Sequence, residues 1–225
     1  MIKIKLRTMK ASKVIWDLAL KAHSEGEVFP IWGTCLGFEQ IGILGSESNT
    51  SVITKGFDSE DFPAPVSFTR HALSSEIMEG MPERLLHAME SKNITYNSHG
   101  QGFDPIMFST NQELVGFFDV VATAVDAKGR PFVAMIEARK NIPIYAVQFH
   151  PEKAIFEWHL PTKIPHQPEA ISIAHYFADF FVEKSRCSSH SFGLSASDEN
   201  RELVQFKTSQ HSYNPDGYFM ETYKF

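Results

Sequence analysis

Apolar positions along the first part of the chain change from helix-like to strand-like spacing. Residues 11–24 carry apolar groups at three- and four-residue intervals, which predicts a helix. Residues 28–32 form an unbroken apolar run, which predicts a strand covered on both faces, as in a parallel central sheet. A second helix is expected after Gly37, with an apolar face made of Phe38, Ile41, Ile43 and Leu44.

The middle of the chain mixes turn-rich segments with strands. Residues 62–65 are predicted as a loop because of their prolines. Residues 97–102 are predicted as a loop because of their glycine and polar residues. From residue 117 to residue 150 the pattern predicts strands, with a turn at 126–129.

The last part of the chain combines one helix with short strands. Residues 169–186 share an apolar face and predict a helix, and candidate strands are expected at 203–206 and 218–220. Strands and helices that alternate first and give way to hairpins later favour the α/β class with antiparallel additions.

Composition narrows the class of protein. The chain has 225 residues, of which 43% are hydrophobic and 21% charged, so collagen-like, disordered and coiled-coil proteins are excluded. The formal net charge of −6 argues against a nucleic-acid partner. No apolar run approaches the ~18 residues of a membrane span, so no membrane association is expected. Two cysteines cannot form a disulfide framework.

The segment Gly33-x-Cys35-x-Gly37 lies between the predicted apolar strand and the predicted helix. This is a cysteine version of the nucleophile elbow, in which glycines two positions away on either side prevent side-chain collisions around a strained residue. The turn also places the sulfur at a helix N-terminus, where amide dipoles favour the thiolate. An isolated cysteine is usually an inert buried residue, but this setting favours a nucleophile.

A proton carrier for such a thiolate is available at the end of a second apolar strand. His150 follows the run at 144–149, and Glu152 lies two residues further on. The carboxylate can fix the tautomer of the ring and stabilise its charged form, which completes a Cys–His–Glu relay. A metal site is not expected, because scattered histidines and one cysteine do not match zinc-ligand spacing.

Two other residues, Cys187 and His99, are of types that could serve in a functional site. Cys187 follows the end of a predicted helix in a polar stretch and is interpreted as structural or incidental. His99 lies in the glycine-containing segment at 97–102, from which it could reach a substrate.

The segments around Cys35 and His150 carry a family resemblance. Residues 29–38 (FPIWGTCLGF) and residues 146–153 (AVQFHPEK), followed by Phe156-Glu157-Trp158, resemble the two active-site segments of γ-glutamyl hydrolases. These are folate polyglutamate hydrolases of the class I glutamine amidotransferase-like superfamily. The resemblance runs from about residue 12 nearly to the C-terminus. Glu39 departs from the glutamine that amidotransferases favour at this position.

The resemblance implies one flavodoxin-like three-layer α/β domain over residues 11–225, without a cofactor. Its substrates would be small molecules, the pteroylpolyglutamates, cleaved at γ-linked glutamates through an acyl-enzyme. Cys35 would be the nucleophile, His150 the general acid and base, and Glu152 the orienting carboxylate. Leu36 would supply a backbone oxyanion donor, and His99 would contact the substrate. A homodimer is a further expectation of the resemblance.

Lysosomal, vacuolar or extracellular localisation is also expected from the family. Two potential N-glycosylation sites, at Asn49 and Asn93, agree with it, while residues 1–10 do not resemble a signal peptide.

Residues 1–10 match no part of the family. By the resemblance, members carry strands and a helix with a Gly-Gly segment ahead of the helix that residues 11–24 match. Without that segment one oxyanion donor would be lost, at a cost of ~10²–10³ in rate. An edge and apolar faces of the sheet would also be exposed.

Two alternatives to an active hydrolase stay open at this point. The chain could be a weakly active or inactive relative that binds γ-glutamyl compounds. It could also be the glutaminase domain of an amidotransferase, which acts on free glutamine. The Glu157-Trp158 extension argues against the glutaminase.

Overall fold

The computed structural model describes residues 2–158, 161–191, 209–210 and 222–223. The chain forms two compact units, Met1–Ser188 and Ser189–Phe225. In the second unit, β8 (Ser209–Gln210) pairs antiparallel with β9 (Thr222–Tyr223). The strands predicted at 203–206 and 218–220 lie outside the described residues.

The larger sheet of the first unit has five strands among the described residues, in the order β1-β7-β6-β5-β3. Only β1 and β7 run parallel, and the other neighbours are antiparallel. The strands are β1 (Ile31–Thr34), β7 (Ile144–Val147), β6 (Pro131–Ala138), β5 (Phe118–Val125) and β3 (Ser67–Phe68).

The strands expected between residues 117 and 150, and the turn that joins two of them, are therefore confirmed. The expected apolar strand before Gly37 is present as β1, and its parallel pairing is confirmed, but the expectation that it is covered on both faces is wrong. This strand begins at Ile31, lies at one end of the strand order, and is only partly buried. An unbroken apolar run does not distinguish a central strand from an edge strand, because both can be short and apolar.

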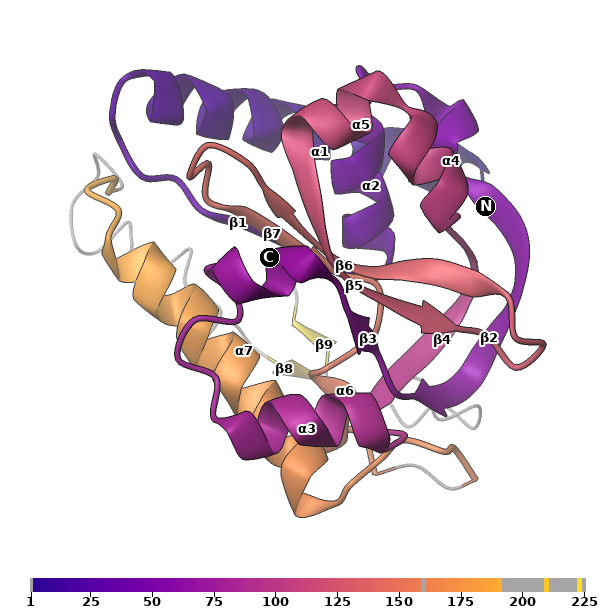
Figure 1. Ribbon diagram of the computed structural model, residues 1–225. Coiled ribbons are helices and arrows are strands. Elements are labelled where there is room, and N and C mark those ends of the chain that lie inside the picture. The colour runs from indigo at the N-terminus through magenta and orange to yellow at the C-terminus, as the bar shows by residue number, and fades with distance from the viewer. Residues whose placement is uncertain (1, 159–160, 192–208, 211–221, 224–225) are drawn as a thin grey trace. The chain divides into compact units, whose positions relative to one another are not determined.

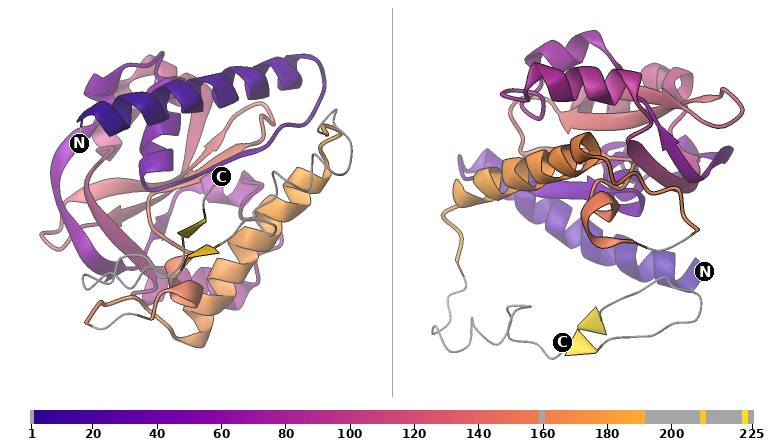
Figure 2. Two further views of the ribbon diagram at one scale, coloured as in Figure 1. Left: turned by 180° about the vertical axis from the view of Figure 1, so that it is seen from behind. Right: turned by 90° about the horizontal axis from the view of Figure 1, so that it is seen from below.

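Helices cover both faces of this sheet (Figures 1 and 2). One face carries α1 (Ile2–Ser24), α2 (Leu36–Gly45), α4 (Pro105–Thr110) and α5 (Gln112–Phe117), and the other carries α3 (Glu83–Ser91), α6 (Lys153–Phe156) and α7 (Pro168–Arg186). Short 3₁₀ turns occur at η1 (Thr50–Val52) and η2 (Arg70–Ser74). The predicted three-layer α/β architecture and the helices at α2 and α7 are thus confirmed.

The sheet separates two hydrophobic cores. Along β7, Ile144 and Ala146 belong to the core beneath α1 and α2, whereas Tyr145 and Val147 belong to the core beneath α3 and α7. This alternation follows from the two-residue period of a strand, and it explains why β7 is apolar at every position.

A separate two-stranded arm pairs β2 (Thr54–Ala64) antiparallel with β4 (Thr95–Gly102). In Figure 1 the arm lies beside the larger sheet. Residues 62–64 and 97–102 are therefore in strands, and the prediction of loops there is wrong. Only residue 65 of the two predicted loops lies outside a strand. Pro63 pairs with Tyr96, and a proline is tolerated in such a strand because it needs to donate no ladder hydrogen bond at an edge.

Helix α1 begins well before residue 11, and its buried face only partly matches the predicted one. Ala19 and Ala22 of the predicted apolar stripe are buried, and Trp16, which was outside the stripe, is buried with them. Val14 and Leu18, which were also in the stripe, are 59% and 49% exposed. The apolar spacing was correct for a helix, but the large ring of Trp16 determines which side packs against the sheet layer.

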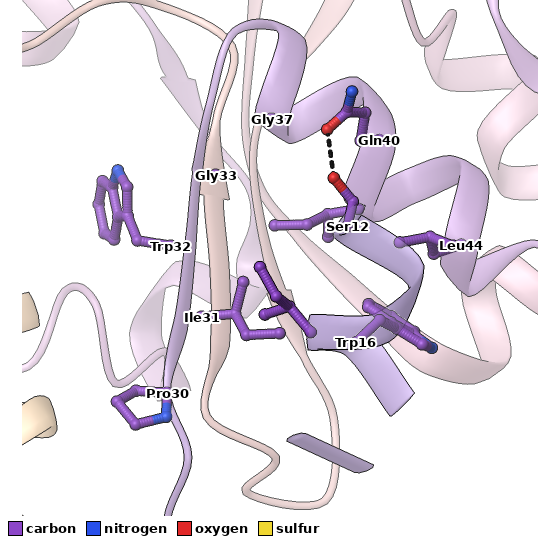
Figure 3. Close-up of a pocket in the computed structure, with 11 residues that line it drawn as sticks. Ser12, Trp16, Pro30, Ile31, Trp32, Gly33, Gly37, Gln40 and Leu44 are labelled. Atoms are coloured by element: carbon purple, nitrogen blue, oxygen red, sulfur yellow. Dashed lines mark hydrogen bonds between the residues drawn. The ribbon is translucent and has the colours of Figure 1, made fainter. Parts of the chain in front are cut away.

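A groove of about 310 Å³ lies between α1, α2 and the edge strand β1 (Figure 3). Ile31, Gly33 and Leu44 line it, and Ser12 on α1 donates a hydrogen bond to Gln40 Oε1 at 2.7 Å across one side. The groove thus lies along β1, which is at one end of the strand order of the described sheet. No helix in the described part of the chain combines the length and apolar character needed to cross a membrane.

Replacing Trp16 by alanine should lower the free energy of unfolding by about 3–5 kcal/mol, because its ring packs against Phe117 and Phe118 at centroid distances of 4.9 and 6.3 Å. Val14→Ala, two residues away and mostly exposed, should cost less than about 0.5–1 kcal/mol. Urea unfolding of both variants measures the difference. Equal losses would show that the assigned buried face of α1 is wrong.

Candidate active site

Cys35 occupies the sharp turn between β1 and α2. Its φ is 51° and its ψ is −103°, a backbone conformation that costs a non-glycine residue energy and recurs at functional sites. The Cys35 N–H donates to the Val147 carbonyl at 2.9 Å, which continues the β1–β7 ladder into the turn. The predicted elbow is therefore present in the backbone.

The two glycines of the elbow differ in their surroundings. A Cβ atom at Gly33 would lie 2.8 Å from the carbonyl carbon of Gly37 and 2.5 Å from Cδ1 of Ile41. A Cβ atom at Gly37 would meet nothing within 4 Å. The expected steric requirement for glycine is confirmed at the first position and is wrong at the second, because the side of α2 that carries Gly37 faces open space.

His150 lies three residues beyond the last residue of β7 and is anchored through both its backbone and its ring. The backbone N–H donates to the Tyr96 carbonyl on β4 at 2.8 Å. Ring atom Nδ1 lies 2.6 Å from Oε1 of Glu152, and the His150 side chain is 18% exposed. The carboxylate thus orients the ring so that Nε2 is the nitrogen available for chemistry.

The His150 ring lies close enough to the Cys35 sulfur for the two groups to interact. Burial opposes the charged ring, but the hydrogen bonds and negative charges of Cys35 and Glu152 outweigh it and raise the pKa of His150 to about 9. The structure therefore places Cys35, His150 and Glu152 near one another. At neutral pH the ring is an imidazolium, which is the partner that a thiolate needs.

Two backbone groups surround the sulfur. The Ser98 carbonyl of β4 lies 4.0 Å from Cys35 Sγ. Leu36 is the first residue of α2, and the first N–H groups of a helix have no partner within the helix. The N–H of Leu36 therefore belongs to the N-terminus of α2, directly after Cys35 in the sequence, and its role as an oxyanion donor stays a prediction.

His99 lies on β4 rather than in a loop, and it is 4% exposed. Burial lowers its pKa to about 4, against the opposing effect of its hydrogen bond to the Gln101 carbonyl at 3.0 Å. Since a carbonyl only accepts, Nδ1 carries the proton and Nε2 is an acceptor. This Nε2 is buried without a hydrogen-bond partner among the described residues.

Two polar residues near the site escaped the sequence analysis. Gln148, two residues before His150, is fully buried, and its amide nitrogen and oxygen both lack partners in the described structure. A glutamine that interrupts an apolar strand just before the histidine is the signal that could have found it. Glu39, noted only as a departure, is 4% exposed and accepts a hydrogen bond from the Gln101 side chain.

The remaining candidates lie apart from this chain of residues. Cys187 is exposed at the end of α7, where its thiol donates to the Glu183 carbonyl at 3.4 Å. In the part of the chain that the structure describes, no three histidine, cysteine, aspartate or glutamate side chains are grouped as metal ligands.

The contrast between the two glycines gives a direct test. Gly33→Ala should destabilise the fold by about 1–3 kcal/mol or more, because its methyl group would collide with the Gly37 backbone. Gly37→Ala should be neutral or stabilising by up to about 1 kcal/mol, as expected for alanine in a helix. Thermal and urea unfolding measure both. Equivalent destabilisation at the two positions would contradict the elbow geometry.

Glu152→Gln should lower the pKa of His150 from about 9 toward the ordinary histidine value of about 6.5. The carboxylate stabilises the charged ring, so removing its charge favours the neutral form and moves deprotonation to lower pH. An NMR titration of the His150 ring measures the change. Glu157→Gln is the control, since Glu157 pairs with Lys153 at 2.6 Å. The geometry is wrong if Glu157→Gln has the larger effect.

Comparison with known proteins identifies a family and several relatives of this chain. The sequence pattern described as Glutamine amidotransferase class-I matches residues 16–158. Gamma-glutamyl hydrolase B of Dictyostelium discoideum is 38% identical over 98% of this chain and 61% of its own length. Human Gamma-glutamyl hydrolase is 35% identical over 88% and 60%, and Gamma-glutamyl hydrolase 1 of Arabidopsis thaliana is 32% identical over 78% and 50%.

The chain thus spans about three fifths or less of the length of these relatives. The matched region includes Cys35, His150 and Glu152, together with the strands and the arm that position them. Because this match covers more than half of the chain, the protein belongs to the glutamine amidotransferase class-I family.

Proposed function

We propose that this chain is a hydrolase of γ-glutamyl bonds that uses Cys35 as its nucleophile. The observation that carries the proposal is the placement of the His150 ring, which interacts with the Cys35 sulfur and has Nδ1 2.6 Å from Glu152 Oε1. The similarity to relatives named gamma-glutamyl hydrolase supports the choice of bond. A nucleophile, a base in contact with it and a third group that orients the base form the arrangement needed for covalent catalysis.

In the first step the Cys35 thiolate attacks the carbonyl carbon of the γ-amide and forms a carbon–sulfur bond. The carbonyl oxygen becomes negative, and the N–H of Leu36 at the start of α2 stabilises it. The carbon–nitrogen bond then breaks as the His150 imidazolium gives its proton to the departing amine. The products are a free amine and a γ-glutamyl thioester.

In the second step neutral His150 removes a proton from water, whose oxygen attacks the thioester. The carbon–sulfur bond breaks, the thiolate and imidazolium are restored, and the γ-carboxylic acid leaves and gives its proton to solvent. Glu152 keeps the ring in one orientation through both steps and stabilises its positive charge. The raised pKa of His150 supports this role, because the ring must begin the cycle protonated.

We further propose folate polyglutamates as the substrates and His99 as a substrate contact. The neutral ring of His99 presents Nε2 as a buried acceptor, which suits an amide N–H of a γ-linked chain rather than a carboxylate. Its position near the nucleophile is supported by the electrostatic effect of His150 on its pKa.

Cys35→Ala should reduce hydrolysis of pteroyldiglutamate by about 10³-fold or more, because no other group can form the acyl-enzyme. Cys187→Ala removes the other, exposed thiol and should retain activity. Product release is followed by chromatography, and circular dichroism checks that both variants fold. A Cys35→Ala variant with full activity would end the proposal, and faster turnover of free glutamine than of the diglutamate would favour a glutaminase.

A further inference from the structure

Strand β2 carries a β-bulge opposite Ser98, within the arm that closes on the active site. Ser59 pairs with His99 and Phe62 pairs with Asn97, so Glu60 and Asp61 together face the single residue Ser98. An extra residue in one strand bends that strand and redirects its side chains, and such bulges recur beside active sites. Both bulge residues direct their carboxylates to β4.

Asp61 connects three segments of the chain through one oxygen atom. Its φ of 48° lies in the left-handed region, which aspartate tolerates better than most residues. Its Oδ1 accepts a hydrogen bond from the Tyr96 hydroxyl at 2.9 Å and another from the Lys163 N–H at 2.8 Å. The carboxylate therefore joins β2 to β4 and to the segment between α6 and α7.

Tyr96 passes this connection on to the catalytic histidine. The residue is 6% exposed, and its carbonyl accepts the backbone N–H of His150 at 2.8 Å. Burial and the neighbouring Asp61 carboxylate raise the pKa of the Tyr96 hydroxyl, so it remains a donor at physiological pH. Tyr96 thus links Asp61 to the His150 backbone, because its hydroxyl binds Asp61 and its carbonyl binds the His150 N–H.

Glu60 makes a parallel connection to the nucleophile. Its Oε2 accepts a hydrogen bond from the Ser98 hydroxyl at 3.0 Å, and the Ser98 carbonyl is the group that faces Cys35 Sγ. The two residues of the bulge therefore hold the two positions of β4 that contact the sulfur and the histidine backbone.

We propose that the bulge at Glu60 and Asp61 positions His150 against Cys35, with Asp61 as the main positioning residue. The pairing of β1 with β7 ends at Val147, so it does not by itself fix a residue three positions later. The bond between His150 N–H and the Tyr96 carbonyl provides the missing constraint, and Asp61 fixes Tyr96. Asp61 touches no reacting atom and is therefore a positioning residue rather than a catalytic one.

The test compares Asp61→Gly with Asp61→Asn in the full chain. Glycine accepts the positive φ but lacks the carboxylate, whereas asparagine accepts the same φ and keeps an oxygen acceptor without the charge. The readouts are the rate at which iodoacetamide alkylates Cys35 at pH 7, in a Cys187→Ala background, and the NMR titration of the His150 ring. The titratable groups that interact with this ring are Cys35, Glu152 and His99.

Asp61→Gly should slow alkylation by about tenfold, because a misplaced ring stabilises the thiolate less well. It should also lower the pKa of His150 below about 9, while Asp61→Asn stays within about twofold of the parent rate. The proposal is wrong if the two variants behave alike, whether both are normal or both impaired. Circular dichroism confirms that each variant is folded before its rate is compared.

Tyr96→Phe keeps the test decisive if Asp61→Gly does not fold. This variant removes only the hydroxyl that donates to Asp61 and leaves the carbonyl that holds His150. It should slow alkylation in the same direction, and an unchanged rate would overturn the proposal. The inference takes its catalytic meaning from the proposed function, but neither readout uses a substrate. A chain that fails to cleave γ-glutamyl bonds would therefore leave this test intact.

Discussion

The parallel pairing of β1 with β7 is the constraint on which the site depends. Thr34 pairs with Val147, and the Cys35 N–H extends the ladder by one further hydrogen bond to Val147. Parallel strands end at the same edge of a sheet, so residues far apart in the chain emerge side by side there. A shift of this register by one residue would turn alternate side chains to the opposite face and separate the sulfur from the imidazole.

The turn at Cys35 combines a strained backbone with a favourable electrostatic environment for the sulfur. The positive φ of Cys35 costs on the order of 1–3 kcal/mol. Hydrogen bonds from the Cys35 N–H to Val147 and from the Glu39 N–H to the Cys35 carbonyl hold the turn in this conformation. The close approach of Gly33 to the Gly37 backbone also constrains the turn. In return, the sulfur lies at a helix N-terminus and beside a ring whose raised pKa keeps it cationic.

The β2–β4 arm supplies the polar environment of the site. His99 on β4 and Gln148 next to the arm hold polar atoms that are buried and unpartnered among the described residues. Buried polar atoms without partners are costly, so a protein retains them where another molecule can satisfy them. The same arm contacts the Cys35 sulfur through Ser98 and the His150 backbone through Tyr96. One irregular pair of strands thus contacts both the sulfur and the histidine backbone.

The sequence by itself determined the local features of this protein. Short-range spacing of residues is enough to predict these features. They are the elbow around Cys35, the His150–Glu152 pair, helix α7 and the strands from β5 to β7. Tertiary structure alone decided which residues these features meet. The arm strands, the buried face of α1 and the protonation of His99 arise from contacts between distant segments, because burial and long-range pairing override local propensity.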